Sequence, residues 1–175
     1  MNVTLAMVMS LDGKTTRWDS PEIYTWTSAE DQSHFFSLIA SHNAIIMGKN
    51  TYEASKKVIR LTPEKLRIVL TSEPASYAGS VVPGQLEFFD STPEKILSEL
   101  ESRQHSDVLL VGGSVTNARF LEAGLVNELW VTIEPRIFGQ GQPLVSAAQL
   151  GTELQLESME QLNDAGTILL KYKVV

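Results

Sequence analysis

The chain has 175 residues, of which 43% are hydrophobic and 20% are charged, a composition typical of one globular domain spanning residues 1–175. Its net charge of −7 and pI of about 5.0 argue against a nucleic-acid backbone as a partner, although a small anionic ligand is still allowed. The absence of cysteine excludes a disulfide framework and a thiol nucleophile.

Targeting, membrane and metal-binding patterns are not recognisable in the sequence. The N-terminal apolar run is short, lacks a basic leader and soon reaches Asp12 and Lys14. No stretch approaches the roughly 18 apolar residues of a membrane span, and the three histidines lack the H-E-x-x-H spacing of zinc enzymes. We therefore expect a cytoplasmic protein with no metal and no membrane partner.

Strands and helices are predicted to alternate from the N-terminus onward. Residues 3–9 form an apolar run typical of a strand buried on both faces. A polar loop follows, and a helix is predicted over residues 28–40, with Thr27 or Ser28 as its N-cap. Short strands over residues 44–47, 66–70 and 86–89 come next, the first running directly into a short helix after Gly48.

The second half of the chain continues the same alternation. A helix is predicted from Pro93 to about Arg103, then a strand over residues 108–111, a helix after the glycine pair, and a strand over residues 128–133. Alternation over residues 153–159, followed by Gly166 and an apolar C-terminus, predicts a closing hairpin. The order predicts an α/β fold, a three-layer sandwich with a mainly parallel central sheet and an antiparallel C-terminal hairpin.

The polar loop before the first helix contains the aromatic residues Trp18, Tyr24 and Trp26. These rings suit two different positions, the protein core or the wall of a pocket for a flat ligand. The residues themselves leave both interpretations open.

Small and polar residues follow four of the predicted strands. They occupy residues 10–14, 48–51, 71–72 and 112–116. Because ligands of open α/β sheets bind beyond the carboxyl ends of the strands, these junctions together predict a long anionic ligand with more than one phosphate. Taken alone, Gly112-Gly113 is equally typical of a plain tight turn, since the G-x-G-x-x-G fingerprint is absent.

Three of these segments resemble the NADPH-binding motifs of dihydrofolate reductase-like proteins. The segments read AIIMGKNTYE, LRIVLTS and LLVGGS, and the resemblance spans essentially the whole chain. It implies that Gly48, Lys49 and Thr51 bind a phosphate and that Thr71 and Ser72 contact the adenosine 2′-phosphate. It also implies that the pyrophosphate lies on the backbone of a turn whose Gly-Gly peptide is commonly cis. The residues of that turn are Gly112, Gly113, Ser114, Val115 and Thr116.

Within this superfamily the chain most resembles the reductase domain of riboflavin-biosynthesis deaminase/reductases. The segments that carry this likeness read MVMSLDGKTT, WTS and GLVNELWVTIEPRIFGQGQPL. It implies an NADPH-dependent reductase acting on 5-amino-6-(5-phosphoribosylamino)uracil, and a homodimer. Asp12 and Lys14 become candidates for positioning the substrate and assisting proton transfer, although a plain Asp-Gly turn with a solvated lysine explains them equally well. The remaining substrate-side candidates are Trp26, Thr27, Asp31 and Val111.

The substrate side departs from that pattern at two positions. Val111 replaces a usual Glu, and residues 55–57 read Ser-Lys-Lys where Asp-x-Pro is usual. Asp31 is placed like the folate-binding carboxylate of dihydrofolate reductases, but we favour a solvated charge in the first turn of a helix. A reductase of dihydrofolate or another pterin, and a non-catalytic NADPH-binding module, are therefore alternatives. Residues 168–175 could pair across a dimer interface or form an internal edge strand.

Overall fold

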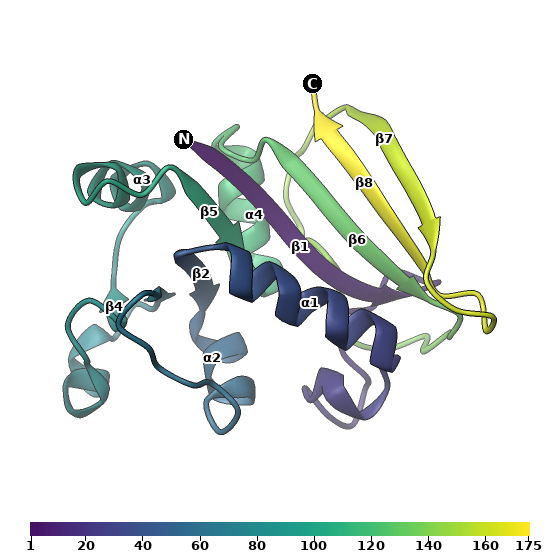
Figure 1. Cartoon of the computed structure of the whole chain (residues 1–175), viewed down its shortest axis with the longest axis horizontal. Coiled ribbons are helices and arrows are strands. Elements are labelled where there is room, and N and C mark those ends of the chain that lie inside the picture. The colour runs from purple at the N-terminus through teal and green to yellow at the C-terminus, as the bar shows by residue number, and fades with distance from the viewer.

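The computed structural model describes residues 1–175, which fold around one eight-stranded sheet with helices on both faces (Figure 1). The strand order is β4-β3-β2-β5-β1-β6-β8-β7. Every pairing from β4 to β6 is parallel, whereas β8 is antiparallel to both β6 and β7. The predicted three-layer α/β sandwich with an antiparallel C-terminal hairpin is confirmed.

The elements follow the predicted order closely. The strands are β1 Asn2–Ser10, β2 Ala44–Gly48, β3 Leu66–Leu70, β4 Leu86–Phe89, β5 Asp107–Leu110, β6 Glu128–Glu134, β7 Leu154–Gln161 and β8 Ile168–Val174. The helices are α1 Ala29–Ser41, α2 Lys49–Ser55, α3 Pro93–Ser102 and α4 Ser114–Glu122, with short 3₁₀ helices η1 Ile23–Thr25 and η2 Pro74–Ser80. None of the helices combines the length and apolarity needed to cross a membrane.

Each face of the sheet carries its own apolar core. On one face, Ile96 and Leu100 of α3 and Phe120 of α4 pack against alternate residues of the central strands. On the other face, Leu38 of α1 and Tyr52 of α2 pack against the residues in between. Because successive strand residues point to opposite faces, burial on both sides requires the nearly continuous apolar runs seen in the sequence.

Two segments differ from the prediction. The loops before α1 and before β4 contain the 3₁₀ helices η1 and η2, and Pro74 begins η2, where its fixed φ favours a helical turn. The C-terminal strand β8 is neither a sheet edge nor free to pair across an interface, because β6 and β7 occupy its two sides. The edge is instead β7, whose eight residues are all exposed.

Candidate functional site

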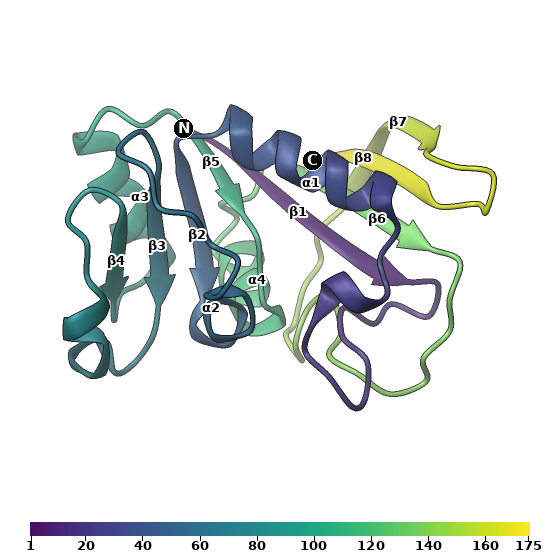
Figure 2. The same cartoon turned by 60° about the horizontal axis from the view of Figure 1, so that its bottom comes forward.

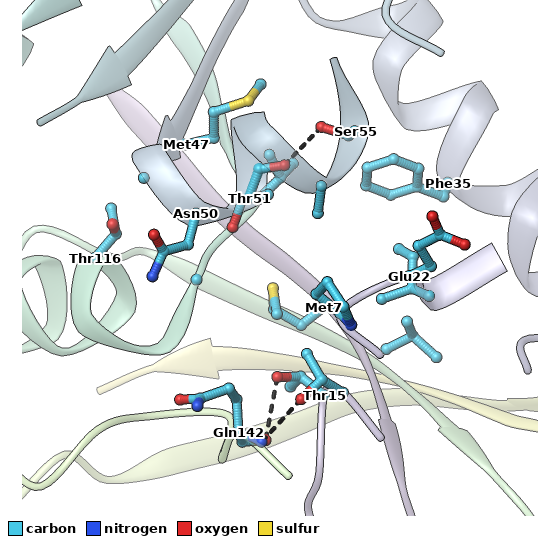
Figure 3. A pocket seen from close by; sticks show the side chains of 18 of the residues that line it. Met7, Thr15, Glu22, Phe35, Met47, Asn50, Thr51, Ser55, Thr116 and Gln142 are labelled. Atoms are coloured by element: carbon cyan, nitrogen blue, oxygen red, sulfur yellow. Dashed lines mark hydrogen bonds between the residues drawn. The ribbon is translucent and has the colours of Figure 1, made fainter. Parts of the chain in front are cut away.

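A cavity of about 1700 Å³ lies at the carboxyl ends of the parallel strands, where the loops and α2 gather in Figure 2. Its walls come from the β2–α2 and β5–α4 junctions, the end of β3, helix α1 and strand β6. Figure 3 shows Asn50, Thr51 and Thr116 on one part of this wall, with Met7, Thr15 and Gln142 across from them. The location is the one expected for ligands of open α/β sheets.

Backbone groups of two junctions meet at the floor of the cavity. Gly48 N–H donates to Gly112 O over 2.7 Å, and Asn117 N–H donates to Gly113 O over 2.9 Å. A Cβ on Gly48 would collide with Thr116 Oγ1, and one on Gly113 would lie 3.2 Å from Thr51 Oγ1. The Gly112–Gly113 peptide is cis. This is a cradle without side chains, open to a phosphate group, and it fits the pyrophosphate of a dinucleotide.

The predicted cofactor residues come together around this cradle. All of them except Gly112 line the cavity. Gly112 has a φ of +90°, and a Cβ there would meet Met7 Sδ at 2.8 Å, so this position favours glycine for backbone and packing reasons. Asn50 also lines the cavity between Lys49 and Thr51, although sequence reasoning did not single it out.

The end of the cavity beside β3 contains paired charges. Lys49 Nζ lies 3.7 Å from Glu73 Oε2, and Glu73 N–H also donates to Thr71 Oγ1 over 3.1 Å. Asp90 and Arg119 line the same end. Lys49 is thus paired with one carboxylate, Glu73, and a second carboxylate of the cavity lining, Glu53, also interacts with its charge.

Asp31 is buried, contrary to the interpretation as a solvated charge. Only 5% of the residue is exposed, and it lines the cavity from the first turn of α1. Burial raises its pKa to about 6, opposed by a hydrogen bond from Thr132 and assisted by the negative charge of Glu134. The solvated interpretation fails because β6 covers this turn. Asp31 thus places a carboxyl with a raised pKa at the cavity wall.

Three further cations also line the cavity. Lys57, Arg60 and Arg67 line it without any ion pair to a carboxylate. Arg67 is 6% exposed, its Nη1 is buried without a hydrogen-bond partner, and burial lowers the pKa of its guanidinium. A buried donor without a partner is costly, which favours an anionic ligand at this place. Sequence reasoning missed Arg67, although a charge inside the apolar run LRIVL was a visible signal.

The other substrate-side candidates are divided between core and cavity. Trp26 is 2% exposed and packs edge-on against Phe138 with ring centroids 5.0 Å apart, away from the cavity lining. Its ring therefore fills the core. Trp18, Tyr24, Thr27 and Val111 line the cavity.

Asp12 and Lys14 lie outside the cavity lining. Asp12 accepts hydrogen bonds from Ser10 Oγ at 2.6 Å, Phe138 N at 3.0 Å and Gly139 N at 2.7 Å. These bonds lower its pKa to about 2. The backbone of Lys14 forms an isolated antiparallel β-bridge with that of Pro143, which joins the same two loops. The geometry gives Asp12 a structural role, tying the loop after β1 to the loop after β6.

Asp12→Ala should therefore lower the melting temperature by a few degrees and loosen residues 135–143, because three hydrogen bonds to the carboxylate are lost. Since folding lowers this pKa, the stabilisation is present above about pH 4 and is lost as pH falls through about 2. Thermal melts between about pH 2 and pH 7 would measure the loss of melting temperature and its dependence on pH, and hydrogen exchange would measure the loosening of the loop. A variant with unchanged melting and exchange would contradict this role.

Comparison with known proteins places these features in a family. Residues 1–168 match the RibD C-terminal domain. An uncharacterized protein, YwjB of Bacillus subtilis (strain 168), is 24% identical over 164 residues, covering 92% of each chain.

Solved structures show the same fold. A putative riboflavin biosynthesis protein from Shewanella sp. PV-4 has a TM-score of 0.80 at 19% identity, with 100% of this chain and 99% of that chain covered. A pyrimidine reductase-like protein from Corynebacterium diphtheriae has a TM-score of 0.76 at 17% identity, with 99% and 92% covered.

A longer relative is the diaminohydroxyphosphoribosylaminopyrimidine deaminase/5-amino-6-(5-phosphoribosylamino)uracil reductase of Thermotoga maritima, with a TM-score of 0.78 at 17% identity. The alignment covers 99% of this chain but only 56% of that protein. Because the family model of the RibD C-terminal domain matches residues 1–168 of the 175 residues, this chain belongs to the RibD C-terminal domain family.

Proposed function

We propose that this chain is an NADPH-dependent reductase that transfers a hydride to a small heterocycle bearing a phosphate. The first candidate substrate is 5-amino-6-(5-phosphoribosylamino)uracil, the compound named for the reductase activity of the Thermotoga relative. One observation carries the proposal: a single cavity contains both the glycine cradle and the unpaired Arg67.

The cradle accounts for the cofactor half of the proposal. Gly48, Gly113 and Thr116 would hold the pyrophosphate, and Thr51 lies beside them. Lys49, Thr71 and Ser72 would meet the 2′-phosphate at the end of β3. NADPH supplies the hydride, so the chain needs only to orient cofactor and substrate and to keep water out.

The cation group accounts for the substrate half. Arg67 and Arg60 would bind the substrate phosphate as charge-assisted donors, with Lys57 as an additional point charge. Phe35, Leu38 and Ile39 of α1 line the cavity as well and offer an apolar wall for a ring. The substrate would then have a flat apolar part and an anionic part.

A pterin or dihydrofolate reductase is the second candidate, favoured by the buried Asp31. A carboxyl whose pKa is raised to about 6 takes up and releases a proton closer to neutral pH than an ordinary aspartate does, so it could exchange a proton with a ring nitrogen. Val111 also favours this second candidate, because it offers the substrate no charge at a position where the riboflavin branch usually has Glu. In either reaction we assign Asp31 to hydrogen bonding or proton transfer at the heterocycle.

The deciding experiment combines binding with turnover. NADPH at about 100 times its Kd should stabilise the fold by about 2.7 kcal/mol, seen as a rise in melting temperature. NADPH oxidation would then be followed with the pyrimidine ribosylamino phosphate and with dihydrofolate. Absence of any NADPH-dependent shift at millimolar concentration would overturn the proposal. Binding without oxidation of either compound would favour a non-catalytic NADPH-binding module.

Replacement of Arg67 by Met should raise KM for the phosphate-bearing substrate by about tenfold to a hundredfold, because a charge-assisted contact is lost. The affinity for NADPH should stay unchanged, since Arg67 is separate from the cradle. Met preserves much of the apolar stem, so the fold should persist. Arg103→Met is the control, because Arg103 pairs with Glu87 and Glu99 outside the cavity. Equal KM values for wild type and Arg67→Met would contradict this role.

We further propose that the chain is a cytoplasmic homodimer that uses the exposed side of β7. Leu154, Leu156 and Met159 are 42%, 51% and 67% exposed, and their pairing with alternate residues of β8 puts them on one face of the sheet. An apolar strip beside an unpaired strand edge is typical of a protein interface. Analytical ultracentrifugation would measure the oligomeric state.

A further inference from the structure

The cation expected to select the 2′-phosphate already has a partner in the chain. Lys49 Nζ lies 3.7 Å from Glu73 Oε2, and the two side chains are 40% and 65% exposed. Glu73 also uses its backbone N–H to bond Thr71 Oγ1 at 3.1 Å. A single residue thus contacts two of the three groups proposed to hold the 2′-phosphate.

We propose that Glu73 is a positioning residue that limits the preference of this protein for NADPH over NADH. The inference rests on the proposed NADPH site. A 2′-phosphate must displace the Glu73 carboxylate from Lys49, whereas the 2′-hydroxyl of NADH leaves the ion pair in place. The binding of NADPH therefore costs the attraction between Lys49 and Glu73, whereas the binding of NADH does not.

The surrounding charges strengthen this effect. Glu53 of α2 also lines the cavity and interacts electrostatically with Lys49, while Arg119 donates through Nη2 to Ser91 O over 2.7 Å. Lys49 is accordingly the cation best placed to bind a 2′-phosphate, and the Glu73 carboxylate competes with that phosphate for Lys49. Because the ion pair is exposed to solvent, the competition is modest, and the protein should accept both cofactors.

Glu73→Gln removes the competing charge and keeps the side-chain size. We expect it to tighten the Kd for NADPH about three- to tenfold and to leave the Kd for NADH within about twofold, as measured by isothermal titration calorimetry at low salt. Glu101→Gln is the matched control, because it makes the same change of net charge at an exposed position of α3, outside the cavity lining. The control should alter neither Kd.

The Lys49→Ala background tests whether Glu73 acts through Lys49. There the gain from Glu73→Gln should fall below about twofold, because no ion pair is left to release. A full gain in that background, or an unchanged ratio of the two Kd values in Glu73→Gln alone, would overturn the inference while the proposed function stands. Failure of the wild-type protein to bind either cofactor would instead overturn both.

Discussion

Asp31→Asn should stabilise the free protein at pH 8 and largely abolish turnover. Folding raises the pKa of Asp31 from 3.8 to about 6, so ionisation in the folded state costs about 1–3 kcal/mol above pH 6. Asn is neutral at every pH and keeps an acceptor for Thr132. The gain should therefore be full at pH 8, shrink as pH falls below about 6, and vanish only below 3.8, where the folded and the unfolded wild type both keep the proton.

Turnover should change in the opposite direction. If Asp31 supplies a proton or a charged contact to the heterocycle, the Asn variant should lose about a hundredfold or more in kcat/KM, while its affinity for NADPH is unchanged. Chemical unfolding at pH 4, 6 and 8, with steady-state kinetics, would measure both. A variant that is no more stable at pH 8, or one that is fully active, would contradict this role for Asp31.

Glu30→Gln is the control for both measurements. Glu30 is the neighbouring carboxylate in the same helical turn, but it is exposed, and a hydrogen bond from Asn163 lowers its pKa. Its contribution therefore has the opposite sign: it stabilises the fold above the ordinary pKa and is lost on acidification. Glu30→Gln should bring no stabilisation at pH 8 and no large loss of turnover.

Gly48→Ala should have the largest effect at the cofactor end. The new Cβ would collide with Thr116 Oγ1 and approach Gly113 N to 3.6 Å. Thr116 is buried and β-branched, which limits its escape to another rotamer. We expect a loss of about 1–3 kcal/mol in stability from overpacking. NADPH affinity should fall at least about tenfold, because the displaced turn no longer fits a phosphate.

Two further variants separate the collision from a general effect of alanine. Gly79→Ala adds a methyl group where no atom lies within 4 Å, so stability and NADPH affinity should hardly change. In Gly48→Ala/Thr116→Ala the colliding oxygen is gone, and part of the lost stability should return. Calorimetric melts and NADPH titrations of the four proteins would test this. No recovery in the double variant would show that the collision is not the cause.

Much of the fold was predictable because its signals are local. Central parallel strands such as β2 and β3 are covered on both faces and must therefore be short apolar runs ending in turn-forming residues. Their carboxyl ends share one edge, so the position of the glycine cradle at that edge followed from the order of the elements. The position of β8 did not follow, because local alternation identifies a strand but not its neighbours.

The surroundings of the two candidate carboxylates, Asp31 and Asp12, could not be predicted, because they depend on distant parts of the chain. Asp31 looks like a solvated first-turn charge until Thr132, far along the chain, is placed against it. From the sequence, Asp12 could belong to a catalytic site or to a plain turn. Only the structure shows that the backbone N–H groups of Phe138 and Gly139 donate to its carboxylate. Arg67 could have been predicted from the sequence alone, because a charged residue inside the apolar run of a buried strand is unusual and indicates a specific role.

The central position of β1 makes closure of the sheet a late event in the synthesis of this chain. Its partners are β5, which begins at residue 107, and β6, which ends at residue 134. Within this sheet, β1 is therefore synthesised long before either of its partner strands, and the apolar side chains on both of its faces stay uncovered until then. High contact order of this kind predicts slow folding and a long period in which chaperones can bind the nascent protein.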